Sequence, residues 1–120
     1  MVTSVPESVP AFFIMTDKIV VLSTCGSAEE AEKIARLLVE RQLAACVNVL
    51  AGLQSIYRWE GAVESAAEWL LVIKSSRARF DELRVALEAA HSYKVPEILA
   101  LPVVEGSQNY LNWLDASLQA

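Results

Sequence analysis

The sequence predicts a small α+β domain of the ferredoxin-like type, with elements in the order βαββαβ and a short helix added at the C-terminus. The main observation is a pair of long segments rich in β-branched and aromatic residues, 46–59 and 62–74, on either side of Glu60-Gly61. Glycine accepts a positive φ without steric cost, so the chain is expected to reverse here and form a hairpin. A segment with helical periodicity lies on each side of the hairpin, and the 120-residue length fits one domain.

Residues 1–17 precede the periodic part of the chain and are expected to form a disordered extension, so that the domain covers residues 18–120. The extension contains two prolines and an apolar patch at 11–15. It has no Lys or Arg before Lys18, whereas a secretory signal would begin with a basic region. Met15 is a candidate start of translation, because the periodic sequence begins just after it.

The first strand is expected at 18–23, because a short β-branched apolar run is typical of a strand covered on both faces. Ser27 and Glu30 then have the spacing of a capping box, in which each side chain satisfies a backbone N–H at the start of a helix. The helix is expected to run to about Gln42. Its buried positions are Ala31, Ile34, Ala35 and Leu38.

Each arm of the hairpin has about 13 residues, whereas an ordinary strand has about 5–6. Strands of that length extend past the body of a 120-residue domain. The projecting part would expose unpaired backbone groups, which are a template for pairing with another chain. We therefore expect sister copies of the chain to complete the hairpin.

A second helix is expected after the hairpin, capped by Ser75-Ser76 and ending at His91-Ser92. Charged residues occupy its exposed positions. Its buried stripe consists of Phe80, Leu83, Leu87 and Ala90.

A last strand is expected at 97–104, and Pro102 places it at a sheet edge or a bulge, because proline lacks the N–H that a ladder requires. A final helix follows Gly106-Ser107, with apolar residues Tyr110, Leu111, Trp113, Leu114 and Leu118. Right-handed crossovers and the hairpin together predict the sheet order 4-1-3-2. Strands two and four would then lie at the two edges of the sheet.

The composition excludes some classes of partner. A net charge of −5 and a pI of about 4.8 argue against nucleic acid, which requires a basic surface. An apolar fraction of 54% and a mean hydropathy of +0.35 favour a buried subunit interface. The apolar run at 98–104 is far short of the roughly 20 residues that span a membrane. Two cysteines without a C-x-x-C spacing favour free thiols and a reducing, cytoplasmic location.

Five segments resemble, in the same order along the chain, those of the CutA divalent-cation-tolerance family. They are 43–48 (LAACVN), 55–61 (SIYRWEG), 73–74 (IK), 91–98 (HSYKVPEI) and 110–113 (YLNW). The resemblance implies a ferredoxin-like homotrimer, similar in architecture to PII signalling proteins, with clefts where strands pair between subunits. It also implies a link to tolerance of copper and other divalent cations, copper binding in several members, and acetylcholinesterase anchoring for animal members. No catalytic activity is generally accepted for the family.

The sequence departs from the family's pattern at three positions. Lys94 stands where the family usually has an acidic or amide residue. Ser23 and Ala90 stand where some members carry Cys and His. Of that set of copper ligands only His91 remains.

The candidate metal ligands are His91 and Cys25. His91 is the single histidine, and imidazole binds copper or zinc; the alternative is a cap at the C-terminus of a helix. Cys25 is expected in the turn before a helix, where the helix dipole lowers a thiol pKa and favours the thiolate that Cu(I) prefers. An ordinary turn residue is the alternative.

A binding cleft between subunits is expected to include seven further residues. Tyr57 and Trp59 alternate onto one strand face, and Lys74 and Glu97 would supply charged groups or pair with each other as an ordinary ion pair. Packing in a trimer core is the alternative for the aromatic residues, and Cys46 would then be a small buried apolar residue. The candidates are Cys46, Tyr57, Trp59, Lys74, Tyr93, Glu97 and Trp113.

We expect a non-enzymatic homotrimer that binds a metal ion, copper first, or a small ligand. The alternative is a PII-like scaffold for signalling or protein interaction without a direct metal role. An enzyme is disfavoured, because the four glycines have no phosphate-loop spacing and one histidine cannot form an H-E-x-x-H site. A cysteine–histidine nucleophile pair would require a thiolate within hydrogen-bond reach of His91.

Overall fold

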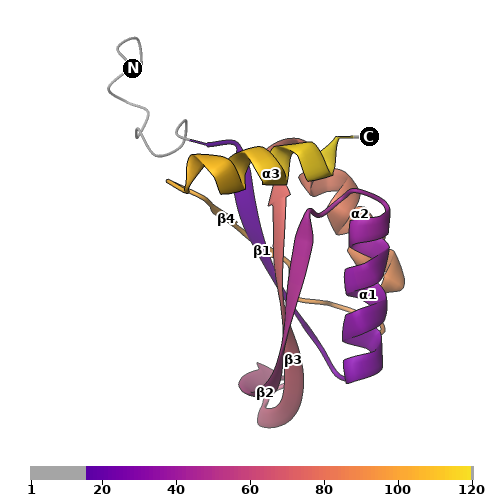
Figure 1. Ribbon diagram of the computed structural model, residues 1–120. Helices are drawn as coiled ribbons and strands as arrows, with labels where there is room; N and C mark the ends of the chain where they lie inside the picture. Colours follow the sequence, from indigo (N-terminus) through magenta and orange to yellow (C-terminus); the bar gives the residue numbers. More distant parts are fainter. Residues whose placement is uncertain (1–15, 120) are drawn as a thin grey trace.

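The computed structural model describes residues 16–119, in which two helices cover one face of a twisted four-stranded sheet and a third helix crosses the end of the strands (Figure 1). The expected extension and the candidate start at Met15 fall on residues 1–15, outside the described residues. The elements are β1 (Lys18–Cys25), α1 (Ala28–Glu40), β2 (Cys46–Trp59), β3 (Ala62–Ser76), the 3-10 turn η2 (Arg77–Arg79), α2 (Phe80–Ala90), β4 (Leu99–Pro102) and α3 (Gln108–Leu118).

The strand order is β2-β3-β1-β4 and all neighbouring strands are antiparallel. This confirms the predicted ferredoxin-like sheet of order 4-1-3-2. β4 pairs only with β1, so Pro102 lies in an edge strand as its missing N–H requires. Ser27 caps α1, since its side chain accepts a hydrogen bond from the Glu30 N–H at 3.2 Å.

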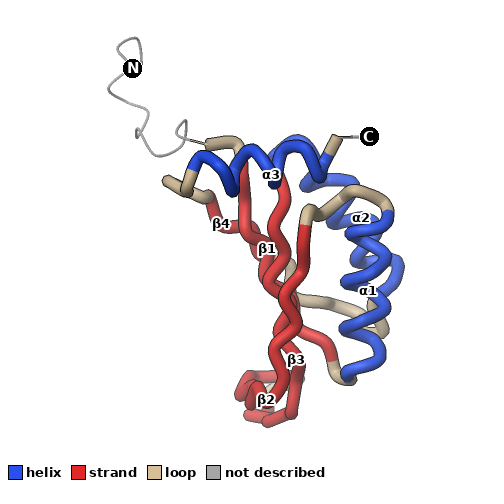
Figure 2. Tube along the Cα trace, in the orientation of Figure 1, coloured by secondary structure: helices blue, strands red, loops and turns tan. Residues whose placement is uncertain are grey.

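The long hairpin has the expected arms, paired from Cys46 with Lys74 to Trp59 with Ala62. Glu60 (φ 49°) and Gly61 (φ 84°) form the reversal. The register shifts between Leu50 and Leu53, where Gly52 has φ 82°, and this bulge was not expected. Figure 2 shows the two arms twisting around each other and extending well beyond the helices.

Three predicted boundaries were wrong. Ser75 and Ser76 belong to β3 instead of capping α2, because the strand continues in pairing with β1 and the Ser75 hydroxyl donates to the Leu43 carbonyl at 2.6 Å. The chain then turns through η2 before α2 begins at Phe80 without a side-chain cap. β4 has only four residues, shorter than the expected 97–104, and β1 continues to Cys25.

The core lies between the sheet and the two covering helices. Buried residues of α1 and α2 (Ala31, Ile34, Leu38, Leu83, Ala86 and Leu87) meet buried residues of β1 and β3 (Ile19, Val21, Leu71 and Ile73). Phe80 and Ala90 pack only partly against this core. A smaller cluster under α3 contains Ala45, Leu114 and Leu118. In residues 16–119 we find no helix with the length and apolar character needed to cross a membrane.

The predicted apolar set of α3 is only partly buried in the single chain. Leu114 and Leu118 are buried, whereas Tyr110 and Trp113 are 44% and 46% exposed. The helix therefore presents an aromatic face that the described part of the chain does not cover.

Candidate functional site

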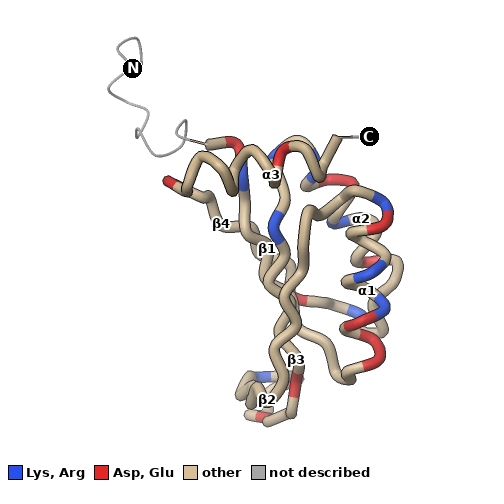
Figure 3. Tube along the Cα trace, in the orientation of Figure 1, with Lys and Arg blue, Asp and Glu red and all other residues tan. Residues whose placement is uncertain are grey.

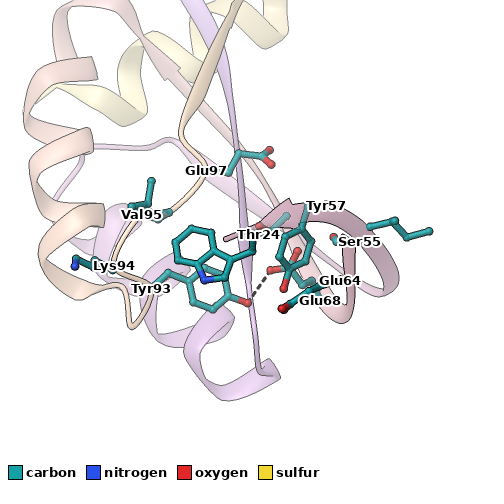
Figure 4. Close-up of a pocket in the computed structure, with 12 residues that line it drawn as sticks. Thr24, Ser55, Tyr57, Glu64, Glu68, Tyr93, Lys94, Val95 and Glu97 are labelled. Carbon is teal, nitrogen blue, oxygen red and sulfur yellow. Dashed lines mark hydrogen bonds between the residues drawn. The ribbon is translucent and has the colours of Figure 1, made fainter. Parts of the chain in front are cut away.

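A cavity of about 700 Å³ lies between the distal part of the hairpin and the loop that follows α2. In Figure 4 Tyr57, Glu64 and Glu68 lie on the hairpin side, and Tyr93, Val95 and Glu97 come from the loop. We refer to this cavity as the hairpin pocket. It is lined by Thr24, Ser55, Ile56, Tyr57, Trp59, Glu64, Glu68, Tyr93, Lys94, Val95, Pro96 and Glu97.

The strand period explains which hairpin residues line this pocket. Successive side chains of a strand point to opposite faces, so Ser55, Tyr57 and Trp59 share one face of β2. Tyr57 is paired with Glu64, and Glu68 lies two strand periods further along β3. All five residues line the pocket, so one face of the hairpin supplies most of this wall; Ile56, from the opposite face of β2, is the exception.

A hydrogen bond joins the two walls. The Tyr93 hydroxyl donates to Glu68 Oε2 at 2.7 Å, and Glu68 is only 7% exposed. Burial, and then the bond to the Glu68 carboxylate, raise the pKa of Tyr93, so its hydroxyl stays protonated and remains the donor.

The negative charges of the pocket are not balanced by the part of the chain that the structure describes. Among residues 16–119, Glu64, Glu68 and Glu97 form no ion pair with Lys or Arg. Lys94 is the single cationic lining residue, and in Figure 4 its side chain extends away from Glu64 and Glu68. Figure 3 shows charged residues gathered along α1, whereas much of β2 carries none.

His91 lies beyond the end of α2 and is 9% exposed. Its Nε2 is 2.7 Å from the Thr24 carbonyl, which can only accept, so Nε2 carries the proton. Its Nδ1 accepts the Tyr93 N–H at 3.0 Å. Both ring nitrogens are therefore engaged with the backbone, and His91 fixes the start of the pocket loop against the end of β1.

Cys25 is brought next to His91, with Sγ 3.8 Å from Nε2. It is fully buried and lies at the end of β1, instead of in the expected turn before α1. Burial, and then the charges of Glu30 and Glu68, raise the pKa of this thiol to about 11. The expectation of a dipole-stabilised thiolate was wrong, because desolvation and negative neighbours outweigh the helix terminus.

The ligand atoms of Cys25, Glu30 and His91 lie within 4.8 Å of one another, the spacing of a metal site. In this arrangement all three groups are otherwise engaged, so an ion would have to displace the thiol proton and existing hydrogen bonds. The thiol is protonated at neutral pH, and the imidazole has no free lone pair. Glu30 is also engaged, since its Oε2 accepts the Ser92 N–H at 2.7 Å. The cysteine–histidine neighbours that a nucleophile pair requires are thus present, but the raised pKa of the Cys25 thiol disfavours the thiolate.

The predicted cleft residues fall into two groups. Tyr57, Trp59, Tyr93 and Glu97 line the hairpin pocket. Cys46, Lys74 and Trp113 lie instead where the start of β2 meets α3, a region that we call the α3 cluster.

In the α3 cluster, Cys46 Sγ is 3.7 Å from both Lys74 Nζ and the Tyr110 hydroxyl. Lys74 Nζ also donates to Asn48, and the Tyr110 and Trp113 rings are 5.4 Å apart. An ion pair between Lys74 and Glu97 is not formed among residues 16–119.

Sequence reasoning missed Glu64 and Glu68, which carry most of the charge near the hairpin wall of the pocket. A signal was present, because counting outward from the reversal at Glu60-Gly61 pairs Tyr57 with Glu64. The sequence could not predict that the loop after α2 approaches this face of the hairpin, because that approach depends on how far the hairpin bends.

The family profile described as "CutA1 divalent ion tolerance protein" matches residues 19–117 of the chain. "Divalent-cation tolerance protein CutA" from Thermus thermophilus is 52% identical over 95 residues, which cover 79% of this chain and 92% of the relative. "Protein CutA, chloroplastic" from Arabidopsis thaliana is 44% identical over 99 residues, covering 82% of this chain and 54% of that protein. The chain thus spans about half the length of the chloroplast relative.

Solved structures show the same fold. The Thermus thermophilus divalent cation tolerance protein (Cut A1) superposes with a TM-score of 0.80 at 50% identity, covering 81% of this chain and 94% of that one. CutA from Xylella fastidiosa superposes with a TM-score of 0.85 at 38% identity, covering 87% of this chain and all of that one.

Proposed function

This chain belongs to the CutA1 divalent ion tolerance protein family, and from this premise we propose that it is a non-enzymatic homotrimer that binds a cation in the hairpin pocket as part of divalent-cation tolerance. The observation that carries the proposal is the set of three pocket carboxylates, Glu64, Glu68 and Glu97, without a cationic partner among residues 16–119. Carboxylate oxygens bind divalent cations directly or through water.

The surface of the single chain supports an assembly of several copies. Ile56, Val63 and Leu99 are 72%, 65% and 58% exposed, and apolar surface of this kind marks an interaction site. β2 and β4 are the two edges of the sheet, and every residue of β4 is exposed. Unpaired edges are ready templates for strands of another copy. The number three comes from the family resemblance.

Light scattering on the full chain at micromolar concentration tests the assembly. The expected mass is about three times the chain mass of 13.2 kDa. A well-folded species with the mass of one chain would contradict the trimer and any cleft that depends on it.

Copper is the first ion to test, because the resemblance points to it. We expect Cu(II), for which carboxylate oxygens are suitable ligands, to bind with a dissociation constant of about a micromolar or tighter in isothermal titration. Replacing Glu64 and Glu68 together by Gln is expected to remove this binding. The matched Cys25→Ser variant is expected to retain it, since the Cys25 thiol is buried and protonated. Binding that survives the Gln substitutions and is lost in Cys25→Ser would place the ion elsewhere.

A scaffold for signalling or protein interaction remains the second candidate, favoured by the exposed aromatic face of α3. Polar groups converge in the hairpin pocket, however, and this convergence favours ligand binding over a purely structural role. We also propose a cytoplasmic location from the two free thiols, which fractionation of cells would test.

A further inference from the structure

The hairpin pocket combines carboxylates with aromatic rings. Tyr57, Trp59 and Tyr93 line it together with the three unpaired carboxylates. We propose that this pocket binds an organic ammonium group, held by the carboxylates and covered by the aromatic faces. The inference rests on the proposed function for the location of the site and goes beyond it in the class of ligand.

The buried carboxylate of Glu68 has no positive partner among residues 16–119. One of its oxygens accepts from Tyr93, but a neutral hydroxyl does not balance the charge of a group that is 7% exposed. An unpaired charge in a poorly solvated site is costly unless a cation or further hydrogen bonds compensate it. Glu64 lies on the same face of β3, four residues away, so it adds to the negative charge of the same wall of the pocket.

The carboxylates are not arranged to chelate a bare metal ion. Within residues 16–119 the sole group of three or more ligating side chains close enough to share an ion is Cys25, Glu30 and His91. No three carboxylates of the hairpin pocket are close enough to hold one bare ion, so the pocket suits a hydrated ion or an organic cation better than an ion enclosed by protein ligands. The volume of about 700 Å³ is in the range of small-molecule sites.

The aromatic rings favour the organic cation over the hydrated ion. Tyr57 is directly opposite Glu64 in the hairpin, so a ring and a carboxylate stand next to each other on one face. Tyr57 and Trp59 are 41% and 46% exposed and available to a ligand. Alkylated ammonium groups bind aromatic faces through cation–π attraction and lose less hydration than a metal ion.

An apolar segment of a second copy is the competing occupant, since Ile56 and Val95 are also exposed at the pocket. Burying such a segment there would desolvate three carboxylates without pairing them, which is unfavourable. The charge of the pocket therefore favours a cation.

Fluorescence titration of the full chain with tetramethylammonium chloride tests the proposal, because Trp59 lies in the pocket. We expect a saturable change in emission that tert-butanol, a neutral molecule of similar size, does not produce. Trp59→Phe should remove the signal.

Glu68→Gln keeps an acceptor for Tyr93 but removes the charge, and is expected to weaken binding at least about tenfold. Glu64→Gln, at an exposed position, serves as a second variant, and Glu105→Gln, exposed and outside the pocket, should bind as the unmodified chain does.

Equal responses to tetramethylammonium and tert-butanol would overturn the proposal, as would unchanged affinity in both Gln variants. Light scattering and copper titration of the same samples separate this failure from failure of the proposed function. A trimer that binds copper and ignores tetramethylammonium would overturn only the ligand class. Trp59 could instead respond to neither probe because a sister copy in the trimer buries it. That result would show that the second copy occupies the pocket, and it would overturn the inference.

Discussion

Two fully buried serines differ in their hydrogen bonds. Ser75 donates to the Leu43 carbonyl at 2.6 Å, whereas the Ser23 hydroxyl has no partner in the described part of the chain. An unsatisfied buried hydroxyl carries its full desolvation cost. The two positions therefore offer a matched comparison within one sheet.

We expect Ser23→Ala to stabilise the chain by about 1 kcal/mol and Ser75→Ala to destabilise it by about 1–2 kcal/mol, because only the second removes a made bond. Urea unfolding of both variants measures the difference. Equal effects of the same sign would show that Ser23 has a partner after all.

Glu30 links α1 to the loop after α2. Burial alone would raise its pKa, but the hydrogen bond from the Ser92 N–H outweighs this and lowers it. A lowered pKa stabilises the fold above the value in the unfolded chain, about 4.3, and this gain is lost as pH falls through the folded value.

Glu30→Gln is accordingly expected to cost about 1 kcal/mol at pH 7 and nothing at pH values below the folded pKa. Thermal unfolding at a series of pH values checks this. A constant difference between the two proteins from pH 7 to pH 3 would contradict it.

At the scale of elements, the reversal of the hairpin has a residue that does not suit its backbone. Glu60 has φ 49° and precedes Gly61, the positions of a two-residue turn in which Asn-Gly is preferred. We expect Glu60→Asn to stabilise the hairpin by about 0.5–1 kcal/mol. Gly61→Ala is expected to destabilise it by about 1–2 kcal/mol through strain alone, since no atom lies near the added methyl group. Denaturant unfolding measures both changes. A Gly61→Ala variant as stable as the unmodified chain would contradict the positive φ at Gly61.

The sequence was sufficient for element order, sheet order and the ends of the hairpin, because these follow from period, glycine chemistry and the handedness of crossovers. It was not sufficient to predict which element Ser75 belongs to, or the direction of the pKa shift of the Cys25 thiol. A serine before a helix can cap it or pair within a strand, and tertiary pairing with β1 decided for the strand. The thiol of Cys25 depends on neighbours from α1 and β3 that local sequence does not reveal.

At the scale of the whole molecule, the chain is elongated. The radius of gyration is 16.2 Å, against roughly 13 Å for a compact domain of about 100 residues. The molecule measures 50 × 33 × 24 Å along its principal axes. Both the large radius of gyration and the long axis result from the hairpin, which projects from the body of the domain.

Val63 tests whether this hairpin joins the copies. It is 65% exposed and lies outside the hairpin pocket. Val63→Lys is expected to shift the trimer towards single chains, because Val63 lies in the projecting part of β3, which has no β1 partner, and a charge there opposes strand and apolar contacts between copies. Val85→Lys, at a 56% exposed position on α2, is the control and should leave the mass unchanged. Light scattering over a dilution series measures the shift, and two identical profiles would exclude the hairpin from the interface.

The bridge from Tyr93 to Glu68 ties the projecting arm to the loop behind α2. The arm that forms one side of the cavity is thus also the arm offered to neighbouring copies. Binding in the hairpin pocket and association of the copies are then linked in one thermodynamic cycle. A ligand that strengthens the association by a given factor must bind the associated form more tightly than the single chain by the same factor.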